Sequence, residues 1–151
     1  MTQEDRLEIN MVSLSGIRLM YGATVAGAGS FGVVHILHPQ VFTKYLGAPS
    51  NADYIYSDGF IGAAFLGFAY MSFKALKKGT DEALIEFLPI LKLQVYYKIF
   101  WAAAFIWKAT TGKLELTQWN MMYFGIMSSF IVGDMIAFHS GEKIEDKRKK
   151  K

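Results

Sequence analysis

The sequence predicts an all-α polytopic membrane protein, in which residues 1–151 form a single domain built as a bundle of four transmembrane helices. Apolar residues make up 52% of the chain and charged residues only 19%, whereas a soluble domain carries about 25% charged residues. The charges are also clustered near the two ends of the chain and around Lys77. The long stretches between these clusters are therefore suited to hydrocarbon.

Four stretches are long enough to cross a bilayer, because about 20 mainly apolar residues span about 30 Å of hydrocarbon. The first ends at His38-Pro39, since proline lacks the N–H that would continue a helix. Lys77 and Lys78 follow the second, and Gly141 stands where a glycine commonly ends a helix. The predicted helices are 14–37, 56–76, 84–108 and 119–139, flanked by a short polar N-terminal tail and a basic C-terminal tail.

The third stretch is the most polar of the four, because it contains Pro89, Lys92, Gln94 and Lys98. Pro89 falls near the first turns, where proline is tolerated, and residues 99–107 are strongly apolar. We interpret this stretch as a spanning helix. An interfacial helix that lies along the membrane surface is the alternative.

The distribution of lysine and arginine predicts the orientation of the bundle, since short cytoplasmic loops are rich in both. Both tails and the loop after the second helix would share one side, and this side is the more basic. We therefore expect both termini on the cytoplasmic side, or on the matrix or stromal side in an organelle. The basic residues of that side are Arg6, Arg18, Lys74, Lys77, Lys78, Lys143, Lys147, Arg148, Lys149, Lys150 and Lys151, against Lys44, Lys108 and Lys113 on the other.

The composition argues against several classes of protein. The chain has no cysteine, which excludes disulfides, thiolate-held metals and iron–sulfur clusters. Its first ten residues are acidic and polar, so we expect the first spanning helix to act as an uncleaved insertion signal. The net charge of +3 comes largely from the C-terminal tail, so it does not indicate a nucleic-acid partner.

Residues 27–32 (GAGSFG) match the dinucleotide-binding fingerprint, but that fingerprint requires a preceding strand and free N–H groups at a helix start. Inside an apolar helix, such small residues indicate close helix packing instead. Small residues four positions apart recur in three predicted helices, and we expect them to face other helices or another subunit. The predicted packing residues are Gly22, Gly27 and Gly32 with Ala26, Ala28 and Ser30, then Gly59, Ala63 and Gly67, and finally Gly125, Ser129 and Gly133.

Charges inside the membrane are the strongest functional indication, because each is costly to bury. Counted at about 1.5 Å per residue from the cytoplasmic end, we place Asp134 roughly 8 Å and Lys92 roughly 9 Å deep. We predict that they form a buried ion pair, with a structural role favoured over a proton or ion relay. Lys98 would lie deeper, bonding to carbonyl or hydroxyl groups or extending to the surface. Arg18 and His35 are further polar residues within the predicted spans.

The three histidines do not form a predicted metal site. His35 and His38 are three residues apart, but His139 belongs to the opposite side of the membrane. Two histidines without a third ligand are insufficient for zinc. No pair of catalytic carboxylates and no nucleophile with a base is visible, so the sequence predicts no metal, no catalytic residue and no obligatory cofactor, with a bound lipid or quinone left open.

Residues 17–67 resemble the first half of small four-helix membrane proteins of the DoxX-like type. The shared features are an arginine early in the first helix (Arg18), a glycine-rich remainder, an exit at His38-Pro39, a Tyr45-Leu46-Gly47 step and a glycine-spaced second helix. The resemblance covers about a third of the chain. It implies an accessory protein associated with a membrane oxidoreductase, and it assigns no catalytic residue.

We therefore expect a non-catalytic structural or accessory subunit of a larger membrane complex, of respiratory or photosynthetic type, with membrane lipids and other subunits as its partners. A lipid- or quinone-binding carrier is the first alternative, and a small membrane enzyme using Asp134, Lys92 or His35 is the second.

Overall fold

The computed structural model describes residues 3–41, 52–114 and 116–149, and all regular structure within them is helical. The predicted all-α class is thus confirmed for this part of the chain. The helices are α1 (Gln3–Leu37), α3 (Ala52–Lys78), α4 (Asp81–Glu86), α5 (Leu88–Thr110) and α6 (Gln118–Lys149).

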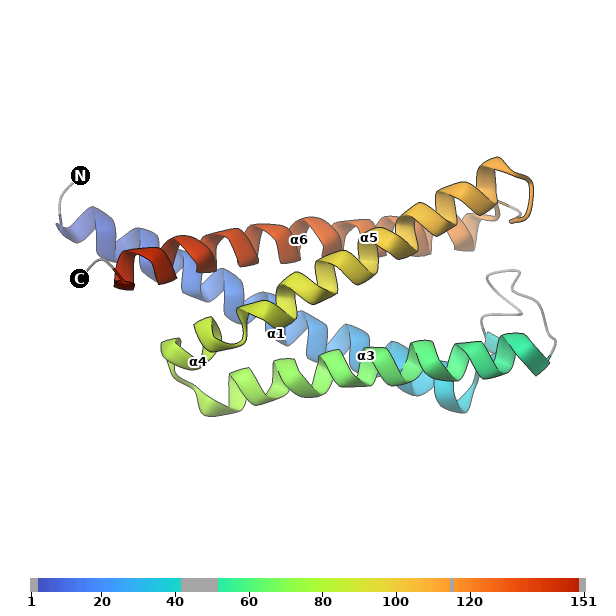
Figure 1. The fold of residues 1–151 in the computed structure, drawn as a ribbon, viewed down its shortest axis with the longest axis horizontal. Coiled ribbons are helices and arrows are strands. Elements are labelled where there is room, and N and C mark those ends of the chain that lie inside the picture. Colours follow the sequence, from blue (N-terminus) through green and yellow to red (C-terminus); the bar gives the residue numbers. More distant parts are fainter. Residues whose placement is uncertain (1–2, 42–51, 115, 150–151) are drawn as a thin grey trace.

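The four long helices form two antiparallel pairs (Figure 1). α1 packs along α3, and α5 packs along α6, while α1 also contacts α6 and so joins the pairs. The short helix α4 lies at the end of the molecule where α1 begins and α6 ends (Figure 1). At the opposite end, α3 begins and α5 ends, and in this view the two pairs diverge toward that end.

Three helices are long and apolar enough to cross a membrane: Leu14–Leu37 of α1, Gly59–Lys78 of α3, and α6. The helix α5 is not among them, because Lys92, Lys98 and Lys108 interrupt its apolar sequence. The end of α1 at Leu37 is as predicted, with His38 N donating to Val34 O at 2.8 Å as the last helical bond.

The stretch predicted as one helix over 84–108 is two helices that meet at Phe87. α4 begins at the Thr80 cap, whose hydroxyl accepts a hydrogen bond from Ala83 N at 3.2 Å. Phe87 then leaves helical geometry, and Pro89 occupies the first turn of α5, where its missing N–H costs nothing. The prediction of a single helix is wrong. It placed Pro89 within one helix that begins at residue 84, whereas Pro89 is the second residue of a separate helix, α5, that begins at Leu88.

The fourth helix is longer than predicted, since α6 continues through Gly141 to Lys149. Gly141 does not end it. Among the described residues the glycines with positive φ are instead Gly79 (φ 71°), just after α3, and Gly112 (φ 69°), just after α5. At Gly141 a Cβ would overlap the side chain of Leu88, so this glycine permits close packing between α6 and the start of α5.

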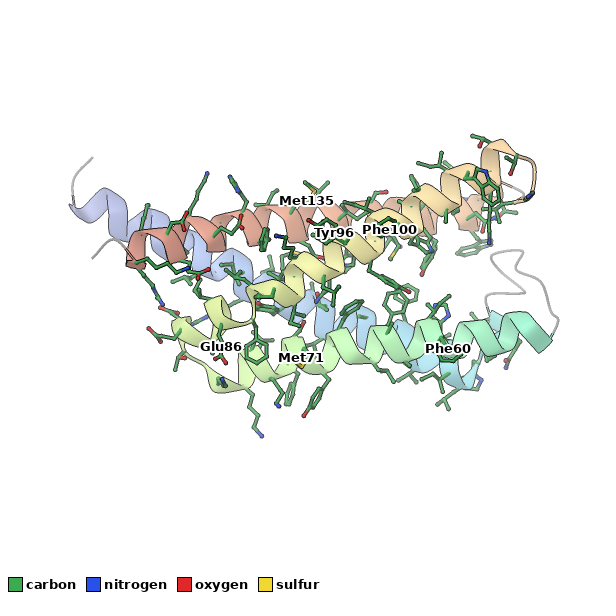
Figure 2. All side chains as sticks on the ribbon, in the orientation of Figure 1. Phe60, Met71, Glu86, Tyr96, Phe100 and Met135 are labelled. Atoms are coloured by element: carbon green, nitrogen blue, oxygen red, sulfur yellow. The ribbon has the colours of Figure 1, made fainter. Side chains whose placement is uncertain are left out.

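The best-packed apolar core lies at the α4 end of the molecule. There α4 is inserted against α1, α3 and α6, and its Leu84 is almost fully buried. The outer surfaces of the long helices are apolar as well: Phe60 of α3, Phe100 of α5 and Met135 of α6 lie there, and each is more than half exposed (Figure 2). The core consists of Ile17, Tyr21, Ala75, Leu84, Ile85, Leu88, Leu91, Ala137 and Ile144.

The closest approach of α1 to α3 is at Gly32 and Gly62. A Cβ on either glycine would stand 2.9 Å from the carbonyl oxygen of the other, closer than real Cβ atoms come. Only glycine fits at these two positions. The predicted packing role of Gly32 is therefore confirmed, while Gly62 was outside the predicted stripes.

Two further predicted glycines lie against other helices. A Cβ on Gly27 would meet the Phe130 ring of α6 at 3.2 Å, and one on Gly133 would meet Met20 of α1 at 2.8 Å. These contacts, both between α1 and α6, hold the two helix pairs together at short distance.

The remaining predicted packing residues meet no other helix among the described residues, so for them contact with another subunit is the part of the prediction that stays open. Regular spacing identifies residues that share a face, but it does not say which way that face points. In α3 the inward face is the one carrying Phe65 and Ala69 instead. A Cβ at Gly22, Gly59, Gly67 or Gly125 would meet nothing within 4 Å among the described residues, and Ala26, Ser30, Ala63 and Ser129 are exposed.

Candidate functional site: a buried polar cluster

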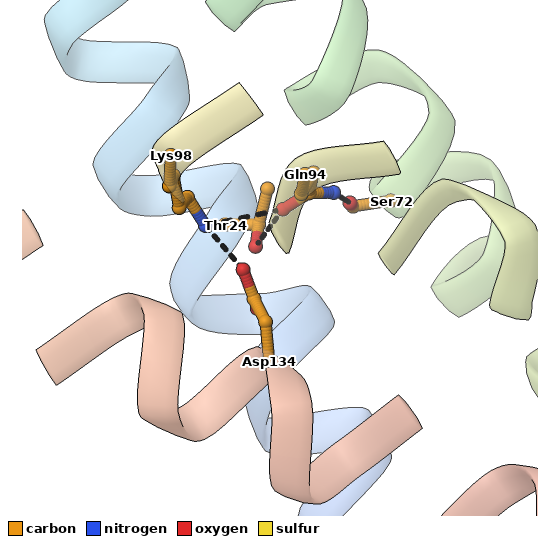
Figure 3. Close-up of polar contacts among 5 residues, drawn as sticks. All are labelled: Thr24, Ser72, Gln94, Lys98 and Asp134. Carbon is orange, nitrogen blue, oxygen red and sulfur yellow. Dashed lines mark hydrogen bonds and ion pairs between the residues drawn. The ribbon is translucent and has the colours of Figure 1, made fainter. Parts of the chain in front are cut away.

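A cluster of five polar side chains lies inside the bundle, with at least one from each long helix (Figure 3). Taken as whole residues, none of the five is more than 5% exposed. Because polar groups are costly to bury without partners, such a cluster is the first place to look for function. Its members, called the polar cluster below, are Thr24 of α1, Ser72 of α3, Gln94 and Lys98 of α5, and Asp134 of α6.

Helical periodicity explains why these residues face inward. In α5 the buried residues follow a spacing of three or four, from Leu91 through Gln94 and Val95 to Lys98. In α1, Thr24 is one turn beyond the buried Tyr21. Each polar residue therefore continues a stripe whose other members are mostly apolar.

Gln94 joins the two helix pairs. Its amide oxygen accepts a hydrogen bond from the Thr24 hydroxyl at 3.1 Å, and its amide nitrogen donates to Ser72 Oγ at 3.4 Å. Lys98 Nζ also donates to the same amide oxygen at 3.5 Å. One side chain of α5 thus bonds to α1, to α3 and to its own helix (Figure 3).

Asp134 pairs with Lys98 (Figure 3). The ammonium group donates to Asp134 Oδ2, and it also lies 5.2 Å from the centre of the Phe130 ring. The side chains are 7% and 0% exposed, so both charges are removed from solvent. A hydrogen-bonded pair with a ring beneath the cation offsets part of this desolvation cost.

The predicted partner of Asp134 was Lys92, and this prediction is wrong. Lys92 is exposed, with Nζ 5.5 Å from the Phe138 ring. The predicted depths depended on where the two helices begin and end, and in the structure α5 begins at Leu88 and α6 continues to Lys149. Moreover, six residues turn a helix by about 600°, so Lys92 and Lys98 point in different directions. The expectation that Lys98 lacks a carboxylate at its level fails for the same reasons.

The second carboxylate oxygen of Asp134, Oδ1, is buried and receives no hydrogen bond from any described residue. The nearby Tyr21 hydroxyl does not supply one, because it donates to Leu84 O at 3.2 Å. An acceptor left in this way costs free energy unless a proton, a water molecule or another donor satisfies it. The polar cluster is therefore complete except at this oxygen.

A small cavity adjoins the polar cluster. Its volume is about 20 Å³, enough for a water molecule and far too small for a quinone ring. Its polar wall is formed by Thr24 and Lys98, and the rest is apolar, with the rings of Phe31, Phe65 and Phe130. The cavity-lining residues of α1 follow Thr24 and those of α6 precede Asp134, so the cavity lies on the side away from α4.

Aromatic rings continue from the cavity across the bundle. Phe31 contacts Tyr123 of α6 at 5.4 Å between ring centres, and Tyr123 contacts Trp101 of α5 at 5.2 Å. Trp101 is thus packed between α5 and α6. Phe105 and Phe124 stack beyond it at 4.8 Å. This half of the molecule is held by aromatic contacts, in contrast to the aliphatic core beside α4.

The other predicted polar residues lie apart from the cluster. His35 is 5% exposed and lies 5.6 Å from the Phe65 ring, on the far side of the cavity from Asp134. Arg18 is about half exposed and pairs with Asp81 of α4 at 2.9 Å. Among the described residues no three histidine or carboxylate side chains gather as metal ligands do.

The sequence analysis missed Thr24, Ser72 and Gln94 as members of a site. Gln94 carried the clearest signal, because it shares one face of the helix with Leu91 and Lys98 while Lys92 does not. Thr24 and Ser72 carry no such signal, since isolated hydroxyls in apolar helices usually bond to their own backbone. Comparison of the chain with family models, with curated proteins and with solved structures finds no match.

Proposed function

We propose that this chain is a non-catalytic structural subunit of a larger membrane complex, of respiratory or photosynthetic type, and that all four long helices cross the bilayer. Three helices have the length and hydropathy that crossing requires. In α5, Lys98 is the only charged residue between Lys92 and Lys108, and it faces inward against Asp134. The lipid-facing surface of that stretch is therefore uncharged, and the two outer lysines can extend to the membrane surfaces.

The orientation that we propose follows from the distribution of basic residues. The α4 end of the molecule carries the basic end of α6 and the Lys77-Lys78 pair, whereas the other end carries Lys108 and Lys113. The α4 end then faces the cytoplasm, or the matrix or stroma in an organelle.

In this proposal the polar cluster has a structural role. No hydrophobic force draws helices together in lipid, so packing and hydrogen bonds between helices must fix their arrangement. Gln94 and the ion pair between Lys98 and Asp134 link α5 to α1, α3 and α6. The cluster thereby selects one arrangement of the two helix pairs.

The observation that carries the proposal is the outward direction of the small residues Gly59, Ala63 and Gly67 on α3. Packing within the chain uses the other side of this helix. Phe60 and Tyr70 of the same helix are exposed as well, so this side of α3 is apolar. Small residues on an outer face allow the backbone of another transmembrane helix to approach closely, which supports association with further subunits.

Native mass measurement of the full chain, extracted from its own membrane in a mild detergent, tests the proposal. The wild type should carry additional membrane subunits. Gly67→Leu should lose them and keep its fold, because a Cβ there meets nothing within 4 Å among the described residues. Phe73→Leu is the matched control, since Phe73 is exposed on another side of the same helix. A wild type that is recovered alone, or equal loss of subunits in both variants, would contradict the proposal.

The resemblance to DoxX-like proteins remains a prediction, and it agrees with an accessory role. A lipid or quinone carrier is the alternative, but the small cavity beside Lys98 would require the helix pairs to separate before such a molecule could enter. In the same native mass measurement, a carrier would appear as a lone chain with a bound lipid or quinone.

A further inference from the structure

The surroundings of the ion pair between Lys98 and Asp134 differ on its two sides. Toward α4, the packed side chains of Tyr21, Leu84 and Leu91 close the interior. Away from α4, Lys98 forms part of the wall of the cavity. The ion pair is thus sealed from one end of the molecule and adjoins a space for water on the side facing the other.

From this asymmetry and from the unpartnered Oδ1 of Asp134, we infer that Lys98 and Asp134 form a proton-binding site that is loaded from one side only, through the cavity. Asp134 is fully buried, and no described donor reaches its second oxygen. A carboxyl group can accept a proton there without any rearrangement of helices. The inference goes beyond a structural role, because it gives the ion pair a change of charge.

The transfer uses groups that are already in contact. Lys98 Nζ donates to Asp134 Oδ2. When this proton moves, the N–H bond breaks, its electron pair stays on nitrogen, and an O–H bond forms at Oδ2. Rotation of the carboxyl group about its Cβ–Cγ bond then carries the O–H to the position of Oδ1, which no described donor occupies. The neutral amine then takes a proton from a hydronium ion in the cavity, which leaves as water. The site has gained one proton, and its net charge has changed from zero to +1.

Few other titratable groups face this site. From α1 the Tyr21 hydroxyl approaches and is held by Leu84 O, and His35 lies beyond the cavity beside Phe65. The described part of α3 contributes Ser72 to the cluster, and a serine hydroxyl does not titrate in this range. The carboxylates of α4 lie at the surface, where Asp81, Glu86 and Glu82 pair with Arg18, Lys78 and Arg148 respectively. On α5, Lys92 points elsewhere, and on α6, His139 is two-thirds exposed. The proton that the site gains is therefore held by Lys98 and Asp134.

Infrared difference spectroscopy of the full chain in lipid bilayers, between alkaline and acidic buffer, tests this inference. Acidification should produce the C=O stretching band of a protonated carboxyl in an apolar environment. The band should vanish in Asp134→Asn and shift in Asp134→Glu, which keeps a carboxyl and serves if the asparagine variant fails to fold. An ion pair that is only structural would give no such band at any pH at which the protein is folded, and that result would overturn the inference.

Access through the cavity is tested by the rate at which the band shifts after transfer to heavy water. Ala28→Leu should slow this exchange, because Ala28 lines the cavity. Ala26→Leu is the matched control on the same helix, since Ala26 is exposed outside the cavity, and it should exchange like the wild type. Equal rates in the two variants would overturn loading through the cavity. Neither result depends on partner subunits, so the inference can fail while the proposed function stands, and the reverse also holds.

Discussion

Gly32 of α1 and Gly62 of α3 face each other so closely that the carbonyl oxygen of each occupies the space of a side chain on the other. Replacing either with alanine should destabilise the pair, since a Cβ so close to a backbone carbonyl forces the helices apart. Overpacking of this kind costs about 1–3 kcal/mol. Thermal unfolding in mild detergent should show the loss for both variants.

Gly22→Ala is the control for this prediction, because a Cβ at Gly22 meets nothing within 4 Å among the described residues. Alanine in a helix interior is more stable than glycine by roughly 0.5–1 kcal/mol. Gly22→Ala should therefore leave stability unchanged or raise it. Equal effects at Gly22 and Gly32 would show that the contact between α1 and α3 is not tight.

Because Lys98 and Asp134 form an ion pair, we predict that substitutions of the two residues have strongly coupled effects on the free energy of unfolding. Lys98→Met or Asp134→Leu alone leaves one buried charge without its partner, which costs about 3–5 kcal/mol. The double variant should recover much of that loss, because two apolar side chains suit the interior. Unfolding free energies of the wild type, both single variants and the double variant measure the coupling.

Lys92→Met is the control for the ion pair. Lys92 is exposed and contacts only the face of the Phe138 ring among the partners described, so its loss should cost well under 1 kcal/mol. If Lys92→Met coupled to Asp134→Leu as strongly as Lys98→Met does, the pairing described here would be wrong.

These residues also show what the sequence can and cannot predict. Hydropathy and length located the long helices, and Pro39 marked the end of α1, because these are local properties of the chain. The ion pair required the register of α5 against α6, which depends on where each helix begins. The predicted start of α5 was four residues early and the predicted end of α6 was ten residues early, and these errors were sufficient to exchange Lys98 for Lys92.

The small-residue stripes failed for a different reason. Periodicity gives the relative directions of residues on one helix but not the direction of the partner helix. Gly59, Ala63 and Gly67 form a regular stripe, yet the bulkier face with Phe65 and Ala69 is the one that meets α1. Of the two neighbours expected for this stripe, the described residues supply no helix, and contact with another subunit stays a prediction.

Gln94 should be the most sensitive uncharged residue of the polar cluster. Gln94→Leu removes the acceptor of the Thr24 hydroxyl and one acceptor of Lys98, so several buried groups lose their partners. Each unsatisfied group costs about 1–3 kcal/mol. Thr24→Val removes a single donor and should cost less. Unfolding measurements that ranked Thr24→Val above Gln94→Leu would contradict the bridging role of Gln94.

The last prediction concerns α5, the one long helix that falls short on hydropathy. The natural chain has no cysteine, so single cysteines can be introduced without background. Glu82→Cys on α4, Lys113→Cys after α5 and Lys147→Cys on α6 are all at exposed positions. If α5 and α6 both span, Glu82→Cys and Lys147→Cys should react with a membrane-impermeant thiol reagent from one side of sealed vesicles, and Lys113→Cys from the other. The physical reason is that Lys98, the one charge inside the apolar stretch of α5, is neutralised by Asp134, so the helix presents no unpaired charge to lipid there. Labelling of Glu82→Cys and Lys113→Cys from the same side would instead mean that α5 lies along the surface, and then the buried ion pair could not hold in the membrane.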